Sequence, residues 1–231
     1  MAHDLGDHVA AERLTREQIR AGDTRQLSSA PFVSLGIAAE ERGDLDQAES
    51  LHTKALERAR RAKSRLGVAV ALGNIGNNAL ARGDRDNAAK SFRESLSLAQ
   101  ELGDPEGIAI GLSNLALVAH WDRDEETALR RYREAFDTAR SVGFTGGIIW
   151  SALGVAAVEV EDDASTATRL LGAADALLSE TGRVLGHQER RLQAEVKQHA
   201  QERLPATAFR AAWAEGRRIG AVTLLSETLR A

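Results

Sequence analysis

The sequence predicts an all-α fold, built as a solenoid of antiparallel helix pairs with a helical cap at its C-terminal end. Three observations carry this prediction. Between Pro31 and Ala62, apolar and small residues follow the i, i+3, i+4, i+7 spacing that places them on one face of a helix. The same pattern returns about every 40 residues. Aromatic residues make up only 4% of the chain, whereas β-sheets rely on aromatic and β-branched side chains.

The composition restricts the class of protein further. Hydrophobic residues account for 43% of the chain and charged residues for 28%, which is ordinary for a folded, soluble domain. The 231 residues include no cysteine, which excludes disulfides and suits the reducing cytoplasm, where we expect the protein to be located. No apolar run approaches the roughly 20 residues that span a bilayer, so no membrane contact is expected. A net charge of −4 argues against direct nucleic-acid binding.

Residues 1–30 are expected to contain a partial repeat, of which only the second helix is present. The stretch from Val9 to Ala21 is amphipathic and is followed by Gly22-Asp23. Glycine readily takes the left-handed conformation that closes a helix. The polar residues 24–30 would then connect this helix to the first complete unit.

Residues 31–182 are predicted to form four complete helix pairs. A shift of 40 residues carries Gly36 onto Gly76 and the Gly43-Asp44 turn onto Gly83-Asp84. In each turn the glycine ends one helix and the aspartate caps the next. The same shift aligns small residues and rings in the second helices: Ala48, Ala88 and Ala128, and His52, Phe92 and Tyr132. Small residues allow close helix approach, and the neighbouring ring fills the remaining gap.

These spacings resemble the tetratricopeptide repeat, whose pattern is W-x2-L-G-x2-Y, then A-x3-F, then P, in a unit of 34 residues. Leu35-Gly36 matches the first element and Ala88-x3-Phe92 the second, in a register shared by three copies. The chain departs from the pattern in its longer period and in lacking the closing proline. The resemblance implies a tetratricopeptide-like α-α superhelix that binds a protein or peptide partner.

Residues 183–231 are predicted to form capping helices, near His187 to Arg203, from Pro205 to about Arg218, and from Ala221 to Leu229. Between Gly182 and Arg218, eight Arg or Lys residues stand against four Glu, a balance of +4, which leaves −8 for the remainder. A solenoid needs a terminal cap with a polar outer face. The alternative is a docking surface for an acidic partner or a nucleic acid.

Two stretches carry a second resemblance. Leu170-Leu171-Gly172-Ala173-Ala174-Asp175-Ala176-Leu177 and Phe209-Arg210-Ala211-Ala212-Trp213-Ala214-Glu215-Gly216-Arg217 are similar to the tail of large bacterial signal-transducing ATPase regulators of the LuxR type. This implies that the chain is the sensor or assembly region of a transcriptional or signalling regulator, either as part of one or as a free-standing relative. The G-x-x-x-x-G-K-[ST] phosphate loop of an ATPase does not occur in this sequence.

The residues that could carry chemistry give no basis for an enzyme, a metal site or a cofactor. The six histidines include no H-x3-H or H-E-x-x-H pair, and no G-x-S-x-G elbow is present. The acidic run from Asp122 to Glu126 lacks the central glycine of a calcium-binding loop, so helix capping is the expected role.

Without a predicted catalytic or metal site, the candidate functional feature is a surface that recognises a ligand. The first helices of a helix-pair solenoid line its concave side. The predicted groove there carries Asn74, Asn77, Ser113, Asn114, His120, Trp121 and Trp150, with Ser34 in the same stripe. Asn suits an extended peptide because its amide is both donor and acceptor; the alternative is that Asn74 and Asn114 bond neighbouring helices. The expected ligand is a protein segment or another copy of this chain, and the alternative is a small-molecule effector sensed in the groove.

Overall fold

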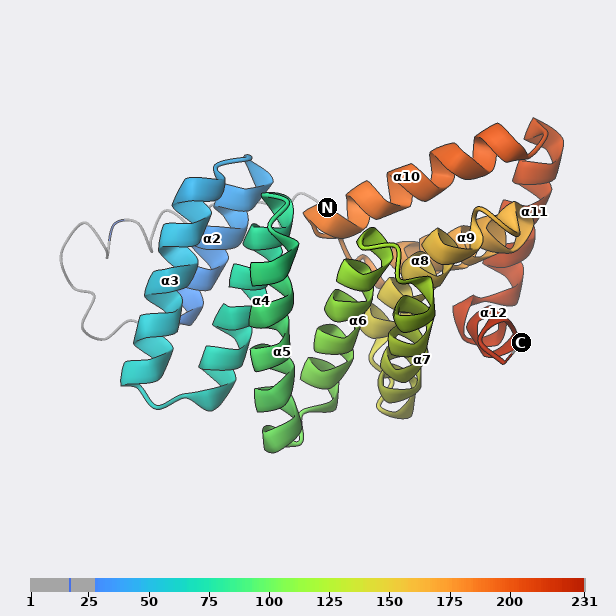
Figure 1. The fold of residues 1–231 in the computed structure, drawn as a ribbon. Helices are drawn as coiled ribbons and strands as arrows, with labels where there is room; N and C mark the ends of the chain where they lie inside the picture. The colour runs from blue at the N-terminus through green and yellow to red at the C-terminus, as the bar shows by residue number, and fades with distance from the viewer. Residues whose placement is uncertain (1–16, 18–27, 231) are drawn as a thin grey trace. The chain divides into compact units, whose positions relative to one another are not determined.

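The computed structural model describes Glu17 and residues 28–230, and the regular elements there are all helices (Figure 1). They are α2 (Ala30–Glu41), α3 (Leu45–Arg61), α4 (Arg65–Ala81), α5 (Arg85–Leu102), α6 (Pro105–Trp121), α7 (Glu125–Ser141), α8 (Thr145–Glu159), α9 (Ala164–Thr181), α10 (His187–Arg203), α11 (Ala206–Ile219) and α12 (Ala221–Thr228). The predicted all-α class is therefore confirmed. The helix expected between Val9 and Ala21 lies outside the described residues. None of the described helices is both long and apolar enough to cross a membrane.

The chain divides into two compact units, and the division falls between Leu98 and Ala99, inside α5. We call the part that ends at Leu98 unit 1. Its described helices form consecutive pairs, because α2 packs against α3 and α3 packs in turn against α4. The first helices α2 and α4 also contact each other, as expected when successive pairs stack.

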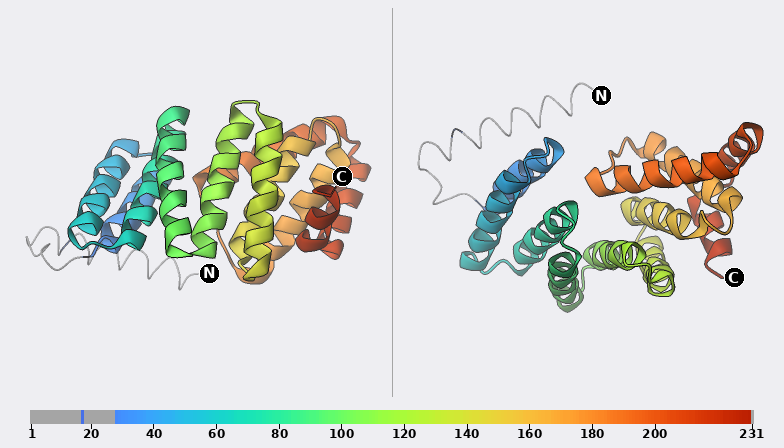
Figure 2. Two further views of the ribbon diagram at one scale, coloured as in Figure 1. Left: turned by 60° about the horizontal axis from the view of Figure 1, so that its bottom comes forward. Right: turned by 45° about the horizontal axis from the view of Figure 1, so that its top comes forward.

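Unit 2 begins at Ala99 and contains α6 to α12. Its first four helices continue the pairing, α6 with α7, α7 with α8 and α8 with α9. The last three helices fold back: α10 and α12 both contact α8 and α9, and α11 packs closely against α9 (Figure 2). The three helices expected after residue 182 are thus present, with bounds within two residues of those predicted.

The turns between paired helices have the predicted chemistry. Gly43 and Gly83 have φ angles of 76° and 80°, in the left-handed region that glycine enters without strain. The following aspartates cap the next helix, since the Asp44 carboxylate accepts a bond from the Gln47 N–H at 3.1 Å. In the acidic run, the Asp124 carboxylate accepts from the Thr127 N–H at 3.1 Å. Capping is therefore the role of Asp124, as expected.

Small residues and rings meet as the repeat pattern predicts. A Cβ added to Gly36 would lie 2.2 Å from Cε1 of His52, and one added to Gly76 would lie 2.4 Å from Cε1 of Phe92. The ring of Tyr132 also packs on a glycine, but this is Gly154 of the following helix α8, which lies outside the 40-residue register of Gly36 and Gly76. The aligned alanines of the second helices are fully buried: Ala48, Ala88 and Ala128. Side chains larger than these would hold the helices apart.

Candidate functional site

The first helices of the four pairs are α2, α4, α6 and α8. When the repeats are aligned with a shift of 40 residues, one residue of each helix falls at the same position of the repeat. That position is occupied by Ile37, Asn77, Leu117 and Ala157. We call the side of these helices that carries it the first-helix face. Residues three, four and seven positions apart lie on the same side of a helix. The other residues of the first-helix face are therefore those at these distances from the matched position.

In unit 1 the first-helix face is open and partly apolar. Ile37 of α2 is 43% exposed, and Leu66 and Val70 of α4 are 55% and 45% exposed. Leu66, Val70 and Asn77 lie on one side of α4, because they are separated by four and seven residues. Leu66 and Val70 are one helical turn apart, and neighbouring exposed aliphatic side chains are typical of an interaction surface.

In unit 2 the matched positions are closed. Leu117 is 6% exposed and Ala157 is 4% exposed. The next residues on the same side, Trp121 and Glu161, lie four positions further on and both contact α10. The Arg191 guanidinium carbon stands 4.9 Å from the centre of the Trp121 ring, and Arg203 forms an ion pair with Glu161. Helix α10 therefore packs against α8 and the neighbouring α9, and it reaches the end of α6 through Trp121. It covers the α8 part of the first-helix face of unit 2.

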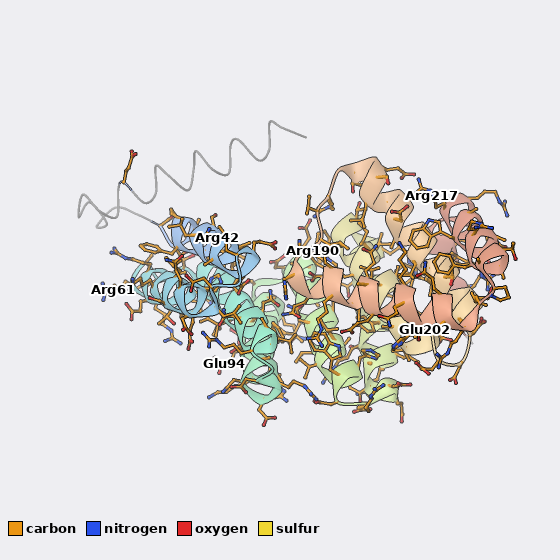
Figure 3. All side chains as sticks on the ribbon, turned by 90° about the horizontal axis from the view of Figure 1, so that it is seen from above. Arg42, Arg61, Glu94, Arg190, Glu202 and Arg217 are labelled. Atoms are coloured by element: carbon orange, nitrogen blue, oxygen red, sulfur yellow. The ribbon has the colours of Figure 1, made fainter. Side chains whose placement is uncertain are left out.

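Figure 3 shows α10 from above, with Arg190 near its beginning and Glu202 near its end. It crosses unit 2 transversely to α6 and α7, rather than continuing their stack (Figure 1). A second contact at its end joins His199 Nδ1 to Glu161 Oε1 at 3.4 Å. A helix in this orientation lies across the pair α8 and α9, rather than beside it as the next member of the stack.

The predicted groove residues of unit 1 differ in their bonding. The Asn74 side chain donates to the Val70 carbonyl of its own helix at 2.8 Å, so it does not bond a neighbouring helix. The residue of α4 that bonds a neighbouring helix is Asn78, which periodicity did not indicate. Its amide donates to the Leu45 carbonyl of α3 at 3.1 Å and accepts from Arg82 Nε at 3.1 Å. Asn77 is partly exposed, and within the described residues its amide makes no hydrogen bond.

The predicted groove residues of unit 2 are less accessible than expected. Ser113 was expected on an exposed stripe, and this is wrong: it is 5% exposed, in a helix that packs against both α7 and α8. Asn114 and His120 are half-buried, and Trp121 lies under Arg191. Asn114, His120 and Trp121 therefore do not line a fully open groove in this unit.

Trp150 has a packing contact within its own unit. Its ring stands edge-on to Phe144, with ring centres 5.5 Å apart, a geometry that stabilises aromatic pairs. Phe144 also precedes the first turn of α8, so the pair holds the start of that helix. The basic C-terminal segment is partly neutralised by acids of unit 2: Arg191 pairs with Glu195 at 2.8 Å, and Arg217 with Asp175.

Burial lowers the pKa of His120, and the charge of Arg123 acts in the same direction. Glu125 and Glu195 oppose this shift. Because the folded protein holds His120 less protonated than the unfolded chain does, unit 2 should lose stability as the pH falls below about 6.5, the ordinary histidine value. We expect His120→Gln to weaken this loss.

The measurement is the melting temperature at about pH 7.5 and about pH 5.5, on either side of the ordinary histidine pKa. The control is His187→Gln, which alters an exposed histidine at the start of α10 and should keep the pH dependence of the parent chain. An unchanged pH dependence in His120→Gln would mean that the buried imidazole is not responsible.

Comparison with known families identifies the type of the first repeats. Residues 28–101 match a family model described as tetratricopeptide repeat. The match covers α2, α3, α4 and all but the last residue of α5. A search of curated proteins finds no significant match. The repeats in this region are therefore tetratricopeptide-like, and repeats of this type generally mediate contacts between proteins.

Proposed function

We propose that the chain is a non-catalytic protein-interaction module, and that the first-helix face of unit 1 binds an amphipathic helix or extended peptide of a partner protein. One observation carries the proposal. Matched faces of the two units differ in that the face in unit 2 is covered by a helix and the face in unit 1 is open. Because a helix binds this side of the repeats in unit 2, the corresponding side in unit 1 is suited to bind a helix as well.

The chemistry of the open face indicates the kind of ligand. Ile37, Leu66 and Val70 offer aliphatic surface, whose removal from water drives association. The half-exposed amide of Asn77 offers a donor and an acceptor to a peptide backbone. Tetratricopeptide proteins that hold acidic peptide ends use Lys or Arg in their groove, and Val70 stands where one such Lys would be. The favoured ligand is therefore a mainly apolar segment.

The finer part of the proposal is that the chain serves as the sensor or assembly region of a bacterial regulator. The two stretches that resemble such regulators meet in unit 2. A Cβ added to Gly172 would lie 2.2 Å from the Trp213 carbonyl oxygen, and one added to Gly216 would lie 1.9 Å from the Arg169 carbonyl oxygen. These reciprocal contacts support treating the two stretches as a single structural feature of α9 and α11.

The interaction surface is tested by Asn77→Arg. The longer, charged side chain should block an apolar ligand on the first-helix face, and a reduction of about tenfold in affinity corresponds to 1.4 kcal/mol. Partner recovery from the native cell extract, quantified by mass spectrometry, gives the readout. The control, Ser50→Arg, adds the same charge at an exposed position of α3. Equal recovery by the two variants would remove the face from the proposal.

A small-molecule effector is the alternative occupant of the same surface. Calorimetric titration of the isolated chain with metabolite mixtures distinguishes the two. We expect no saturable heat without a protein partner. Saturable binding that Asn77→Arg abolishes would replace the interaction module with a sensor, in which the effector shifts the population of two states.

A further inference from the structure

We propose that α10 is an internal ligand of unit 2, which occupies the first-helix face and detaches to admit a partner helix of similar chemistry. The inference rests on the proposed use of first-helix faces for binding, and extends it to regulation. It assigns to α10 a role beyond that of a static cap.

Helix α10 packs on unit 2 through a narrow apolar stripe of its own side chains. Its buried apolar residues recur every four positions: Leu192, Val196 and Ala200. The remainder of the helix is strongly polar, and most of its charged side chains are exposed. By comparison, α8 buries nearly all of its residues. Because burial of apolar surface is the main favourable contribution to helix docking, α10 is held less firmly than the helices of the repeat pairs.

Several other contacts of α10 involve charged, partly exposed side chains, including Lys197, which stands 5.6 Å from the centre of the Trp213 ring of α11. Arg191 stacks on Trp121 near the beginning of the helix, and Arg203 pairs with Glu161 at its end. The side chains of Arg203 and Glu161 are 37% and 47% exposed. Ion pairs that remain in contact with water contribute little to stability and are weakened by salt. Each contact is weak, but together they add to the hold of the apolar stripe, so that removing both should favour the open state.

Buried polar atoms also weaken the docked state. Gln188 on α10 has its Oε1 buried without a hydrogen-bond partner in the described chain, and the same is true of Nδ1 of His120 on α6. A buried polar atom without a partner costs free energy that solvation would recover. Trp121, the residue after His120, lies against Arg191 of α10, so α10 meets the end of α6 at this point. Detachment of α10 would uncover this end of α6.

The connections at both ends allow α10 to move without its neighbours. Residues 182–186 join it to α9, with Gly182 in the left-handed conformation and Val184 almost fully exposed. Leu204 and Pro205 join it to α11. Helix α11 is held separately on α9, through the close contacts of Gly172 and Gly216. For this segment to leave as a strap, Leu185 must come out of its buried position and Lys197 must leave the Trp213 ring of α11, while the close contacts between α9 and α11 remain.

The structure of α10 defines the partner that would replace it. That partner is an amphipathic helix with small or aliphatic residues at four-residue spacing. It carries Arg near each end, one to stack on Trp121 and one to pair with Glu161. The sequence of α10 itself, residues 187–203, is the natural probe for such a helix.

Detachment can be measured by thiol labelling, because the chain has no cysteine of its own. A single thiol introduced by Ala157→Cys reports on the covered face, one turn before Glu161. The matched control, Ala156→Cys, lies at the neighbouring position aligned with Gly76, where the chain packs against the second helices. Both alanines are buried. In the full chain, we expect the thiol at position 157 to be labelled at least tenfold faster than the thiol at position 156, since local opening needs less free energy than global unfolding.

The double change Arg191→Ala and Arg203→Ala should raise the labelling rate at position 157 further, by about tenfold if the open population rises by that factor. It should leave the rate at position 156 unchanged. Arg210→Ala, at an exposed position of α11, should alter neither rate. Equal labelling rates at positions 156 and 157 in every variant would overturn the proposal, because α10 would then open only when unit 2 unfolds.

Binding of a fluorescent peptide of residues 187–203 completes the test. We expect the Arg191→Ala and Arg203→Ala chain to bind it about tenfold more tightly than the parent chain, whose face is occupied for more of the time. Equal affinity for the two chains, or binding to neither, would contradict the proposal. Asn77→Arg should change neither labelling nor peptide binding, so failure here is distinguishable from failure of the interaction surface in unit 1.

Discussion

Gly216→Ala is expected to destabilise unit 2 by about 3 kcal/mol, close to the upper end of the usual cost of overpacking. The added methyl carbon would lie 1.9 Å from the Arg169 carbonyl oxygen, and it would meet backbone rather than a side chain that can rotate away. Helices α9 and α11 would have to separate. Alanine is favoured over glycine in a helix by about 1 kcal/mol, which is too little to offset this clash.

Urea unfolding followed by circular dichroism measures the change. The control is Gly73→Ala in α4, where the added carbon meets only Ser95 Oγ at an ordinary 3.7 Å. That variant should be as stable as the parent chain or more stable. Gly172→Ala should resemble Gly216→Ala, and the double variant should lose less than the sum, because helices already moved apart accommodate the second methyl group. Parent-like unfolding of Gly216→Ala would contradict the observed close approach of α9 and α11.

Ala88→Trp is expected to disrupt the folding of unit 1. Ala88 is fully buried in α5, one turn before Phe92, whose ring packs on Gly76. An indole at this position has no space without separating α4 from α5, and overpacking on this scale costs about 3 kcal/mol or more. The expected result is loss of cooperative unfolding in the part of the chain that ends at Leu98.

Amide hydrogen exchange resolves the effect by segment, because it reports protection separately for α3, α4 and α5. The control is Lys90→Trp, which introduces the same side chain two residues later at an exposed position of α5. It should keep the parent protection pattern. If Ala88→Trp also kept that pattern, the buried alanines would not be the points of close helix contact that the repeat requires.

Much of the fold follows from local patterns in the sequence. The Gly43-Asp44 and Gly83-Asp84 turns, the buried alanines and the ring positions all lie within one repeat, so spacing alone predicts which side chains meet. The bounds of α10, α11 and α12 follow from helix-breaking residues such as Gly220 and Pro205. The tetratricopeptide match over residues 28–101 covers the region of the first two of these repeats.

The candidate site is less predictable, because periodicity shows which residues share a face but not what covers that face. Ser113 and Leu117 have the spacing of first-helix positions, yet they are buried in unit 2. The helices that pack against α6 are α7 and α8, and the spacing within α6 does not show which of its sides they bury. The role of Asn78 was missed for a related reason: Asn77 and Asn78 are adjacent, and only the packing of α4 on α3 decides which of them turns inward.

The central claim, that the first-helix face of unit 1 contacts a partner protein, is tested most directly by site-specific photo-crosslinking. A photoreactive amino acid replaces Val70 on that face or, as the control, exposed Lys54 on α3. Irradiation in the native cell extract should give a defined protein adduct from position 70 that is absent from position 54. Identical adducts from both positions, or none from position 70 while the chain remains folded, would contradict the claim.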